Sequence, residues 1–475
     1  MMVERLMVDL ICLGQRAWEC IPTPLRNKEL CKYKSPSFLT HSLCFEVINI
    51  ILRSYLRYKS YDMVRITYIL LCVGIALALP VAKRDNAPVP IAGKYIITLR
   101  PGAAPSFETH LSWVRDVHTR SLSRRDESGI EKVYSALDFH GYAGSFDEET
   151  IAQIRANPDV SSVEQDQTFH LTYHLPSQPR HRQTGLTTQK DAPWGLGSIS
   201  HRAPNSTDYI YDSRGDAVDG YTAYVVDTGI RTTHNEFEGG RAIFGYNAYP
   251  DADSDEDNIG HGTHVSGTIA GKTYGVAKKA RVVAVKVFDW GSSTTSIVLD
   301  GYLWAVNNIT TPAKSVINLS LGGPQSDAVD SAIAAAYSAG ILTVVAAGND
   351  GRSSDNGWGS PASAPEALAV GAVDVENVRP SFSNWGPGVD IWAPGVMVRS
   401  AWNWDDGDYL EVEGTSMASP HVAGLVLYLR SLEGGGQGGL VGAVVDKVRE
   451  LGTKGVVKEA GRGSVNLLTY NGNGA

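Results

Sequence analysis

Three side chains in the C-terminal half of the chain have the types that together let a hydroxyl group attack a carbonyl carbon. Asp227 follows the apolar run Tyr-Val-Val, His261 opens a glycine-rich stretch, and Ser416 lies in the segment GTSMASP. A carboxylate can orient a histidine, the histidine can accept the serine proton, and the serine can then act as a nucleophile. Each residue also has an ordinary explanation alone, because aspartate favours turns and serine caps helices. Only the combination predicts covalent catalysis.

The segment around Ser416 has the composition of a loop that turns into a helix. Small residues allow a tight backbone turn, and proline is tolerated in the first turn of a helix, where we place Pro420. We therefore expect a helix to begin near Ser416, with capping by Ser416 or Ser419 as the alternative role of a serine here. The first N–H groups of a helix lie at the positive end of its dipole and can hold a negative oxygen.

The two histidines of the glycine-rich stretch raise the question of a metal site. His261 and His264 form an H-x-x-H pair, but a metalloprotease helix carries glutamate directly after the first histidine, and Gly262 holds that position. We interpret His264 as a packed residue next to the site and His421 as a structural residue. The sequence thus favours catalysis without a catalytic cofactor.

The fold that positions these residues is predicted by apolar runs of strand length. The runs are residues 221–230, 280–288, 314–323 and 340–349. Continuous apolar strands separated by helices are typical of a parallel sheet that is buried on both faces. We predict an α/β fold, a three-layer sandwich around a mostly parallel central sheet. Ligands of such sheets bind beyond the carboxyl ends of the strands, where Asp227 falls.

A smaller unit precedes this domain. Residues 92–172 alternate strand-like and helical patterns in the order of the split βαβ motif, which predicts a small α+β domain of the ferredoxin-like type. Residues 173–191 are polar and rich in proline, glutamine and arginine, a composition typical of a linker.

The N-terminal region contains a segment with the layout of a secretory signal. Residues 63–82 combine a methionine, an arginine, an apolar stretch and small residues suited to cleavage. We expect Met63 to be the biological start and residues 1–62 to be an incorrect upstream extension. If the extension is translated, residues 66–79 form a short anchor instead, although they are brief for a full membrane span.

The overall composition excludes several classes of protein. The formal net charge is −9 and no basic stripe with interleaved aromatic residues occurs, so we expect no nucleic-acid partner. With 43% hydrophobic and 20% charged residues and 49 glycines, the chain has the composition of a turn-rich globular enzyme. All five cysteines lie in the first 72 residues, so we expect the remaining chain to fold without disulfides.

Three motifs together resemble the signatures of the subtilisin family of serine proteases. They are VVDTGI with Asp227, GHGTHVSGTIAG with His261, and GTSMASPHVAG with Ser416, in the chain order of subtilisin. The segments APWGLGSIS, SPASAP and GSVNLLTYN are similar to the proteinase K branch. Residues 92–172 similarly resemble the family's inhibitory propeptide. The resemblance implies a signal peptide, a propeptide region that includes the linker, and a subtilisin-like catalytic domain, at residues 63–82, 83–186 and 187–475.

The resemblance also implies further site residues. Asn349, in VVAAGND, matches the asparagine whose side chain helps to bind the tetrahedral oxyanion, although asparagine is also a common turn residue. A short segment matches the strand whose backbone pairs with an extended substrate, namely Ser320, Leu321, Gly322 and Gly323. Recognition through the main chain implies broad specificity, with bulky apolar residues preferred before the cleaved bond.

One structural calcium ion is implied by the same resemblance. Its ligands would be the carbonyl oxygens of Pro365 and Ala367 and the carboxylate of Asp390, which suit a hard cation. A second calcium site of the family does not carry over, because Val456 occupies the position of an acidic ligand.

Three asparagines lie in N-x-[ST] glycosylation sequons. We expect Asn205 and Asn308 to be acceptors, whereas Asn318 falls in a predicted buried strand and is a poor acceptor.

These observations lead to one functional hypothesis and two alternatives. The resemblance implies a secreted, extracellular and monomeric serine endopeptidase of protein or peptide substrates, made as a zymogen that its own propeptide inhibits and that processes itself. One alternative is a catalytically silent binding protein on the same fold, which the intact catalytic residues argue against. The other is a membrane-anchored processing protease, which requires residues 1–62 to be translated.

Overall fold

The computed structural model describes the small domain and the large domain of the chain. The described residues are 89–103, 106–121, 128–171, 187–215, 220–249, 254–289, 291–434 and 441–474. The predicted signal segment 63–82, residues 1–62 and most of the linker lie outside them. Within the described ranges, no helix combines the length and the apolar character needed to cross a membrane.

The small domain consists of antiparallel strands and two helices. Its elements are β1 (Pro90–Leu99), α4 (Phe107–Arg120), β2 (Gly129–Ala136), β3 (Phe139–Ser145), α5 (Glu148–Arg155) and β4 (Val160–Leu171). The strands pair in the order β4-β1-β3-β2, as in a ferredoxin-like split βαβ motif. On α4, Phe107, Leu111 and Val114 recur at helical spacing and bury one face of the helix in the domain core. The predicted α+β domain is therefore confirmed.

The large domain is built on one long sheet. Its central strands are β7 (Thr222–Asp227), β8 (Ala242–Asn247), β9 (Arg281–Lys286), β11 (Ser315–Leu319), β13 (Leu342–Ala346), β14 (Leu368–Val373), β15 (Ile391–Pro394), β18 (Thr453–Lys454) and β19 (Leu467–Leu468). They pair in the order β18-β19-β15-β14-β13-β11-β7-β9-β8. Each neighbouring pair of this sheet is parallel except β18 and β19.

The remaining elements of the large domain are helices and short strand pairs. The helices are α6 (Trp194–Ser200), α7 (His261–Ala270), α8 (Thr295–Asn308), α9 (Asp327–Ser338), α10 (Thr415–Leu432) and α11 (Val441–Leu451). The short strands are β5 (Thr188–Gln189), β6 (Tyr209–Ile210), β10 (Ser292–Thr294), β12 (Leu321–Gly322), β16 (Val398–Ala401) and β17 (Tyr409–Val412).

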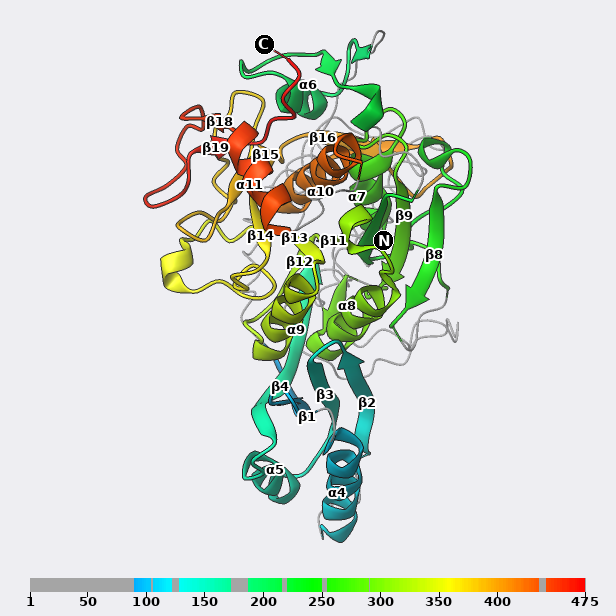
Figure 1. The fold of residues 1–475 in the computed structure, drawn as a ribbon, viewed down its shortest axis with the longest axis vertical. Coiled ribbons are helices and arrows are strands. Elements are labelled where there is room, and N and C mark those ends of the chain that lie inside the picture. The colour runs from blue at the N-terminus through cyan, green and yellow to red at the C-terminus, as the bar shows by residue number, and fades with distance from the viewer. Residues whose placement is uncertain are drawn as a thin grey trace, which may run out of the picture. The chain divides into compact units, whose positions relative to one another are not determined.

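Helices cover both faces of the sheet and make the predicted three-layer sandwich (Figure 1). Alternate residues of β7 face opposite cores. Val225 belongs to the cluster that contains α7 and α10, and Val226 to the cluster that contains α8 and α9. Because both faces are buried, the strands are continuously apolar, which is why the sequence pattern predicted them.

The observed strands refine the predicted runs. The strands β7, β9 and β13 lie inside the predicted ranges, whereas the run 314–323 divides into β11 and β12 with Ser320 between them. The sheet also extends beyond the four runs through the strands β8, β14, β15, β18 and β19.

The helix expected near Ser416 is α10, which begins at Thr415 and has Gly414 as its N-cap. The expectation that Pro420 lies in the first turn is wrong, because it lies inside the helix. A proline has no N–H group, so it cannot donate to the carbonyl of Ser416 four residues earlier. The hydroxyl of Ser320 donates to that carbonyl instead, at 2.9 Å. The carbonyl that the proline leaves without a helical donor thus connects the start of α10 to Ser320, directly after β11.

Candidate active site

Asp227 and His261 meet at the carboxyl edge of the sheet. Asp227 is the last residue of β7, and His261 is the first residue of α7. Both side chains are buried, and Asp227 Oδ1 lies 2.7 Å from His261 Nδ1. Because a carboxylate accepts hydrogen bonds, the network assigns the donating proton to Nδ1. In the neutral ring, Nε2 is then the nitrogen that can take up a proton.

Two glycines allow His261 to begin its helix at this point. Gly260 has φ of 102°, a left-handed conformation, and a Cβ there would come within 2.5 Å of the Trp402 ring. A Cβ on Gly262 would lie 2.1 Å from the carbonyl oxygen of Gly229. Trp402 on one side and the loop after β7 on the other therefore exclude side chains next to the histidine.

Ser416 lies in the first turn of α10, which packs beside α7 (Figure 1). Its side chain is buried, and its Oγ donates a hydrogen bond to the carbonyl oxygen of Ser320 at 2.9 Å. Since Ser320 directly follows β11, this contact places Ser416 at the same sheet edge as Asp227 and His261. The structure thus brings the three predicted residues to one edge of the sheet.

Asn349 lies three residues beyond the end of β13 and is fixed by the residue before Ser416. Its side-chain oxygen accepts from the backbone N–H of Thr415 at 2.9 Å and from the Thr415 hydroxyl at 2.7 Å. A backbone N–H can only donate, so the amide oxygen must face Thr415. The amide nitrogen therefore faces away from Thr415 as an oriented donor.

In the segment from Ser320 to Gly323, the first two residues are buried and the two glycines are half-buried. Ser320 is buried, and its hydroxyl also contacts the Ser419 hydroxyl at 2.8 Å. Leu321 and Gly322 form β12, which pairs antiparallel with the end of β4 from the small domain. Only the backbone of this segment is thus available to an extended chain.

The last residues of β4 lie between two strands of the large domain. His170 is opposite Gly322 of β12 on one side and opposite Ser292 of β10 on the other. Phe169 fits against Gly323, where a Cβ would come within 2.5 Å of the phenyl ring. The small domain therefore places its own extended strand where the sequence predicts that substrate pairs.

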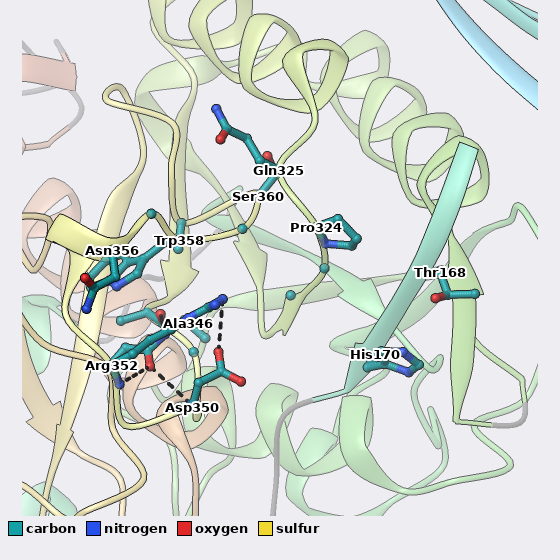
Figure 2. Close-up of a pocket in the computed structure, with 18 residues that line it drawn as sticks. Thr168, His170, Pro324, Gln325, Ala346, Asp350, Arg352, Asn356, Trp358 and Ser360 are labelled. Atoms are coloured by element: carbon teal, nitrogen blue, oxygen red, sulfur yellow. Dashed lines mark hydrogen bonds and ion pairs between the residues drawn. The ribbon is translucent and has the colours of Figure 1, made fainter. Parts of the chain in front are cut away.

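A pocket of about 320 Å³ opens beside this strand (Figure 2). Figure 2 shows Thr168 and His170 of β4 along one side, with Asp350 and Arg352 on the loop after β13. Arg352 Nη2 lies 3.4 Å from Asp350 Oδ2. The wall residues include alanines and glycines, so the pocket combines a small-residue surface with a charged pair.

Comparison with known proteins identifies the family. The profile described as "Subtilase family" matches residues 219–455, and that described as "Peptidase inhibitor I9" matches residues 94–172. The chain is 54% identical over 407 residues to subtilisin-like proteinase Mp1 of Magnaporthiopsis poae, a match that covers 84% of this chain and 95% of that protein. The chain belongs to the subtilase family.

Two further matches support this family assignment. An alkaline proteinase of Hapsidospora chrysogena is 49% identical over 415 residues, which cover 86% of this chain and 99% of that protein. A crystal structure of a cold adapted subtilisin-like serine proteinase matches with a TM-score of 0.55 and 41% identity, over 59% of this chain and 99% of that one. This subtilase is a serine endopeptidase that carries its own inhibitory propeptide domain, and the family and fold implied by the motifs are confirmed.

The propeptide of the subtilase binds the N-termini of two enzyme helices. Glu164 accepts from the hydroxyl of Ser326, the N-cap of α9, and from the N–H of Asp327 at 2.9 Å. Asp166 accepts from the N–H of Ser296 in α8 at 3.1 Å and from its hydroxyl at 2.6 Å. Burial raises the pKa of the Glu164 carboxyl to about 7 against these hydrogen bonds, which lower it.

Asp257 is a site residue that the sequence analysis missed. It is buried, and its Oδ1 accepts from the Thr228 hydroxyl and the Gly260 N–H, both at 2.7 Å. Its Oδ2 accepts from the N–H and the hydroxyl of Thr263 at 2.9 and 2.6 Å. One carboxylate therefore joins the residue after Asp227 to both sides of His261. The only signal in the sequence is an acidic residue four positions before the histidine.

His264 and His421, the other two histidines of the catalytic motifs, are packed inside the protein. His264 and His421 are buried, and each ring contacts a backbone carbonyl, that of Val398 at 2.9 Å and that of Met417 at 2.8 Å. Burial lowers their pKa values to about 3 and about 4, so both rings are neutral near pH 7. This agrees with their interpretation as packed residues.

The carboxylate implied as a calcium ligand already has two protein partners in this structure. Asp390 Oδ1 lies 2.6 Å from Arg449 Nη2, and its Oδ2 accepts from the Ala369 N–H at 2.8 Å. Both carboxylate oxygens thus face donors. The Asp390 carboxylate, which the resemblance implies as a calcium ligand together with the carbonyls of Pro365 and Ala367, is therefore already engaged.

The sequon asparagines differ in exposure as expected. Asn205 and Asn308 are exposed, whereas Asn318 is fully buried and donates to the Ser320 hydroxyl at 2.9 Å.

Proposed function

We propose that this subtilase cleaves peptide bonds through an acyl-enzyme on Ser416. His261 is the general base and acid, Asp227 orients it, and Asn349 with the Ser416 N–H binds the oxyanion. The observation that supports this assignment most directly is the 2.7 Å contact between buried Asp227 and His261 at the sheet edge that also holds Ser416. Subtilases need no catalytic cofactor, and these roles use only side chains and backbone of this chain.

The proposed reaction has two halves. Ser416 Oγ attacks the substrate carbonyl carbon while its proton passes to His261 Nε2, and the Asn349 amide nitrogen donates to the oxyanion that forms. The C–N bond then breaks, and His261 returns the proton to the leaving amine. Water attacks the ester by the same proton transfers and releases the acid. Asp227 keeps the ring in the tautomer that both halves need.

We infer that substrates bind as β4 does in the precursor, by antiparallel pairing with β12 and β10. Main-chain pairing supports broad specificity toward proteins and peptides. The preference for bulky apolar side chains before the cleaved bond remains part of the proposal. The pocket in Figure 2 is large enough for such a side chain.

The proposal also covers secretion, maturation and glycosylation of the protein. Residues 63–82 direct secretion, the propeptide region 83–186 is removed by self-processing, and residues 187–475 form an extracellular, monomeric catalytic domain that does not bind membranes. Self-processing cuts within or next to the linker 173–191, and the exposed Asn205 and Asn308 carry glycans. The proposed function does not include the calcium ion implied by the resemblance, because Arg449 and the Ala369 N–H already contact the Asp390 carboxylate.

Covalent labelling tests the catalytic assignment directly. We expect a fluorophosphonate to label Ser416 in the processed enzyme, because only a serine next to a working base reacts rapidly. Mass spectrometry of the digested protein locates the label. Ser419 is the internal control, since it lies on the same helix and is buried as well. His261→Ala should abolish labelling. A label on another serine, or none in enzyme that still cleaves peptides, would contradict the proposal, and an unlabelled inactive protein would favour the silent binding protein.

The contacts of Glu164 predict that propeptide binding weakens as pH rises. The pKa of about 7 in the complex exceeds the ordinary 4.5 of a free glutamate, so binding takes up protons between these values. The complex is therefore tightest below pH 4.5 and weakens up to about pH 7, by roughly 10- to 100-fold. The rate at which activity appears after processing, followed from pH 4.5 to 8, measures this release.

Glu164→Gln should reduce that pH dependence, because glutamine has no carboxylate to desolvate. The charge of Asp327 next to Glu164 raises the same pKa and stays in place. Glu149→Gln on the exposed face of α5 removes an equal charge and should leave the profile unchanged. Identical pH profiles for the Glu164 and Glu149 variants would refute the assignment.

A further inference from the structure

The carboxylate of Asp390 has two donors from different parts of the fold. It immediately precedes β15, and its backbone N–H donates to the carbonyl of Ala369 in β14 at 2.9 Å. Its Oδ2 accepts from the Ala369 N–H at 2.8 Å, and its Oδ1 lies 2.6 Å from Nη2 of Arg449 in the last turn of α11. Asp390 thus joins two neighbouring strands to the helix near the C-terminus.

In this arrangement, each oxygen of the Asp390 carboxylate already contacts an N–H donor. A divalent cation would have to compete with one of these donors. Calcium takes about six to eight oxygen ligands, and an anionic oxygen is its main source of charge compensation. The Arg449 guanidinium offers only N–H donors, carries a permanent positive charge and lies against the oxygen that the ion would need. No cluster of three or more histidine, cysteine, aspartate or glutamate side chains that could hold a metal occurs in the described part of the chain.

The Asp390 carboxylate needs compensation because it is largely withdrawn from solvent. Its side chain is 23% exposed, and burial raises its pKa, while the Ala369 N–H and the Arg449 guanidinium lower it. The Arg449 side chain is 47% exposed, so solvent screens the pair from the guanidinium side, and what distinguishes it from a surface pair is the partly buried carboxylate. Val444 and Val448 of the same helix are buried in the core cluster that contains α10. The ion pair therefore anchors a helix that already packs on the core.

We propose that Arg449 takes the structural place of the calcium ion, so that the folded enzyme is stabilised by an internal cation and not by calcium. The positive charge that would otherwise come from a dissolved calcium ion belongs here to the Arg449 side chain of α11. The enzyme then keeps its stability in chelator, and loses it when the guanidinium is removed.

The test compares thermal unfolding with and without calcium in the processed enzyme, blocked at its active serine by a sulfonyl fluoride to prevent self-digestion. Melting temperatures are measured in excess chelator and in millimolar calcium chloride. In wild-type enzyme we expect no difference between the two. Arg449→Ala should lower the melting temperature in chelator by on the order of 3 °C or more, because Asp390 loses its charged partner. Calcium should restore part of that loss, since the carboxylate is then open to an ion.

Two further variants make the result specific. Lys447→Ala removes an exposed ion pair with Glu450 on the same helix and should change neither the melting temperature nor its response to calcium. Asp390→Asn combined with Arg449→Ala should abolish the calcium response, which locates the ion at this carboxylate. The proposal fails if calcium raises the melting temperature of wild-type enzyme as much as that of Arg449→Ala. It also fails if the calcium response of Arg449→Ala survives in the double variant.

Discussion

Full-length protein with Ser416→Ala is expected to accumulate as an uncut precursor. In subtilisin, loss of the nucleophilic serine lowers kcat by about 10⁶-fold, and self-processing depends on the same group. The strand β4 already lies antiparallel to β12 next to the site, so the precursor is positioned for cleavage and lacks only the nucleophile. Gel electrophoresis and intact mass measured over days would follow the cleavage.

Two controls separate lost chemistry from lost folding. Ser419→Ala removes a hydroxyl from the same helix that also contacts Ser320, and it should leave processing within a few-fold of the wild-type rate. A small amount of active wild-type enzyme added to the Ser416→Ala precursor should cut it in the linker, which shows that the precursor is folded and cleavable. Efficient cleavage of the purified variant without added enzyme would rule out Ser416 as the nucleophile.

The parts of the fold that the sequence predicts are those fixed by local pattern. The strand β7 is continuously apolar because one face packs under α7 and α10 and the other under α8 and α9. The end of this strand locates Asp227, and the run of glycines around His261 is visible in the sequence itself. These features need no knowledge of distant residues, so the residue pattern is enough to predict them.

The parts that the sequence does not predict depend on pairs far apart in the chain. The position of Pro420 inside its helix depends on the hydroxyl of Ser320, which replaces the missing hydrogen bond and lies 96 residues before Ser416 in the chain. Asp257 is one of several acidic residues in its loop, and only the fold shows that it binds both sides of His261. Neither pairing has a periodic signal in the sequence.

The calcium expectation shows the limit of resemblance in a similar way. Asp390 occupies the position that the family pattern assigns to a ligand, so its residue type alone supports an ion. Arg449, 59 positions later in the sequence, reaches the same carboxylate and changes what it can bind. A motif therefore identifies a ligand only when the residues that could compete for it are also known.

Asn349→Asp is expected to lower kcat strongly while leaving the fold intact. Aspartate keeps an oxygen for the Thr415 N–H and hydroxyl, which Asn349 binds at 2.9 and 2.7 Å, but it has no amide nitrogen to donate. Removing one oxyanion donor costs about 10²–10³ in kcat, a magnitude established in subtilisin, and the added negative charge opposes the oxyanion further. Because the donor acts mainly in the transition state, KM should change little.

Comparison with Asn349→Ala distinguishes this role from a structural one. Alanine removes the donor and also the acceptor for Thr415, so it should lower both kcat and the melting temperature, whereas aspartate should lower kcat alone. Both variants can be matured by wild-type enzyme in trans, then purified and compared by steady-state kinetics and thermal unfolding. If Asn349 only shaped the turn after β13, the aspartate variant would keep its turnover number within a few-fold of wild type, because its contacts with Thr415 remain. Such a result would remove Asn349 from the oxyanion site and leave the Ser416 N–H as its proposed donor.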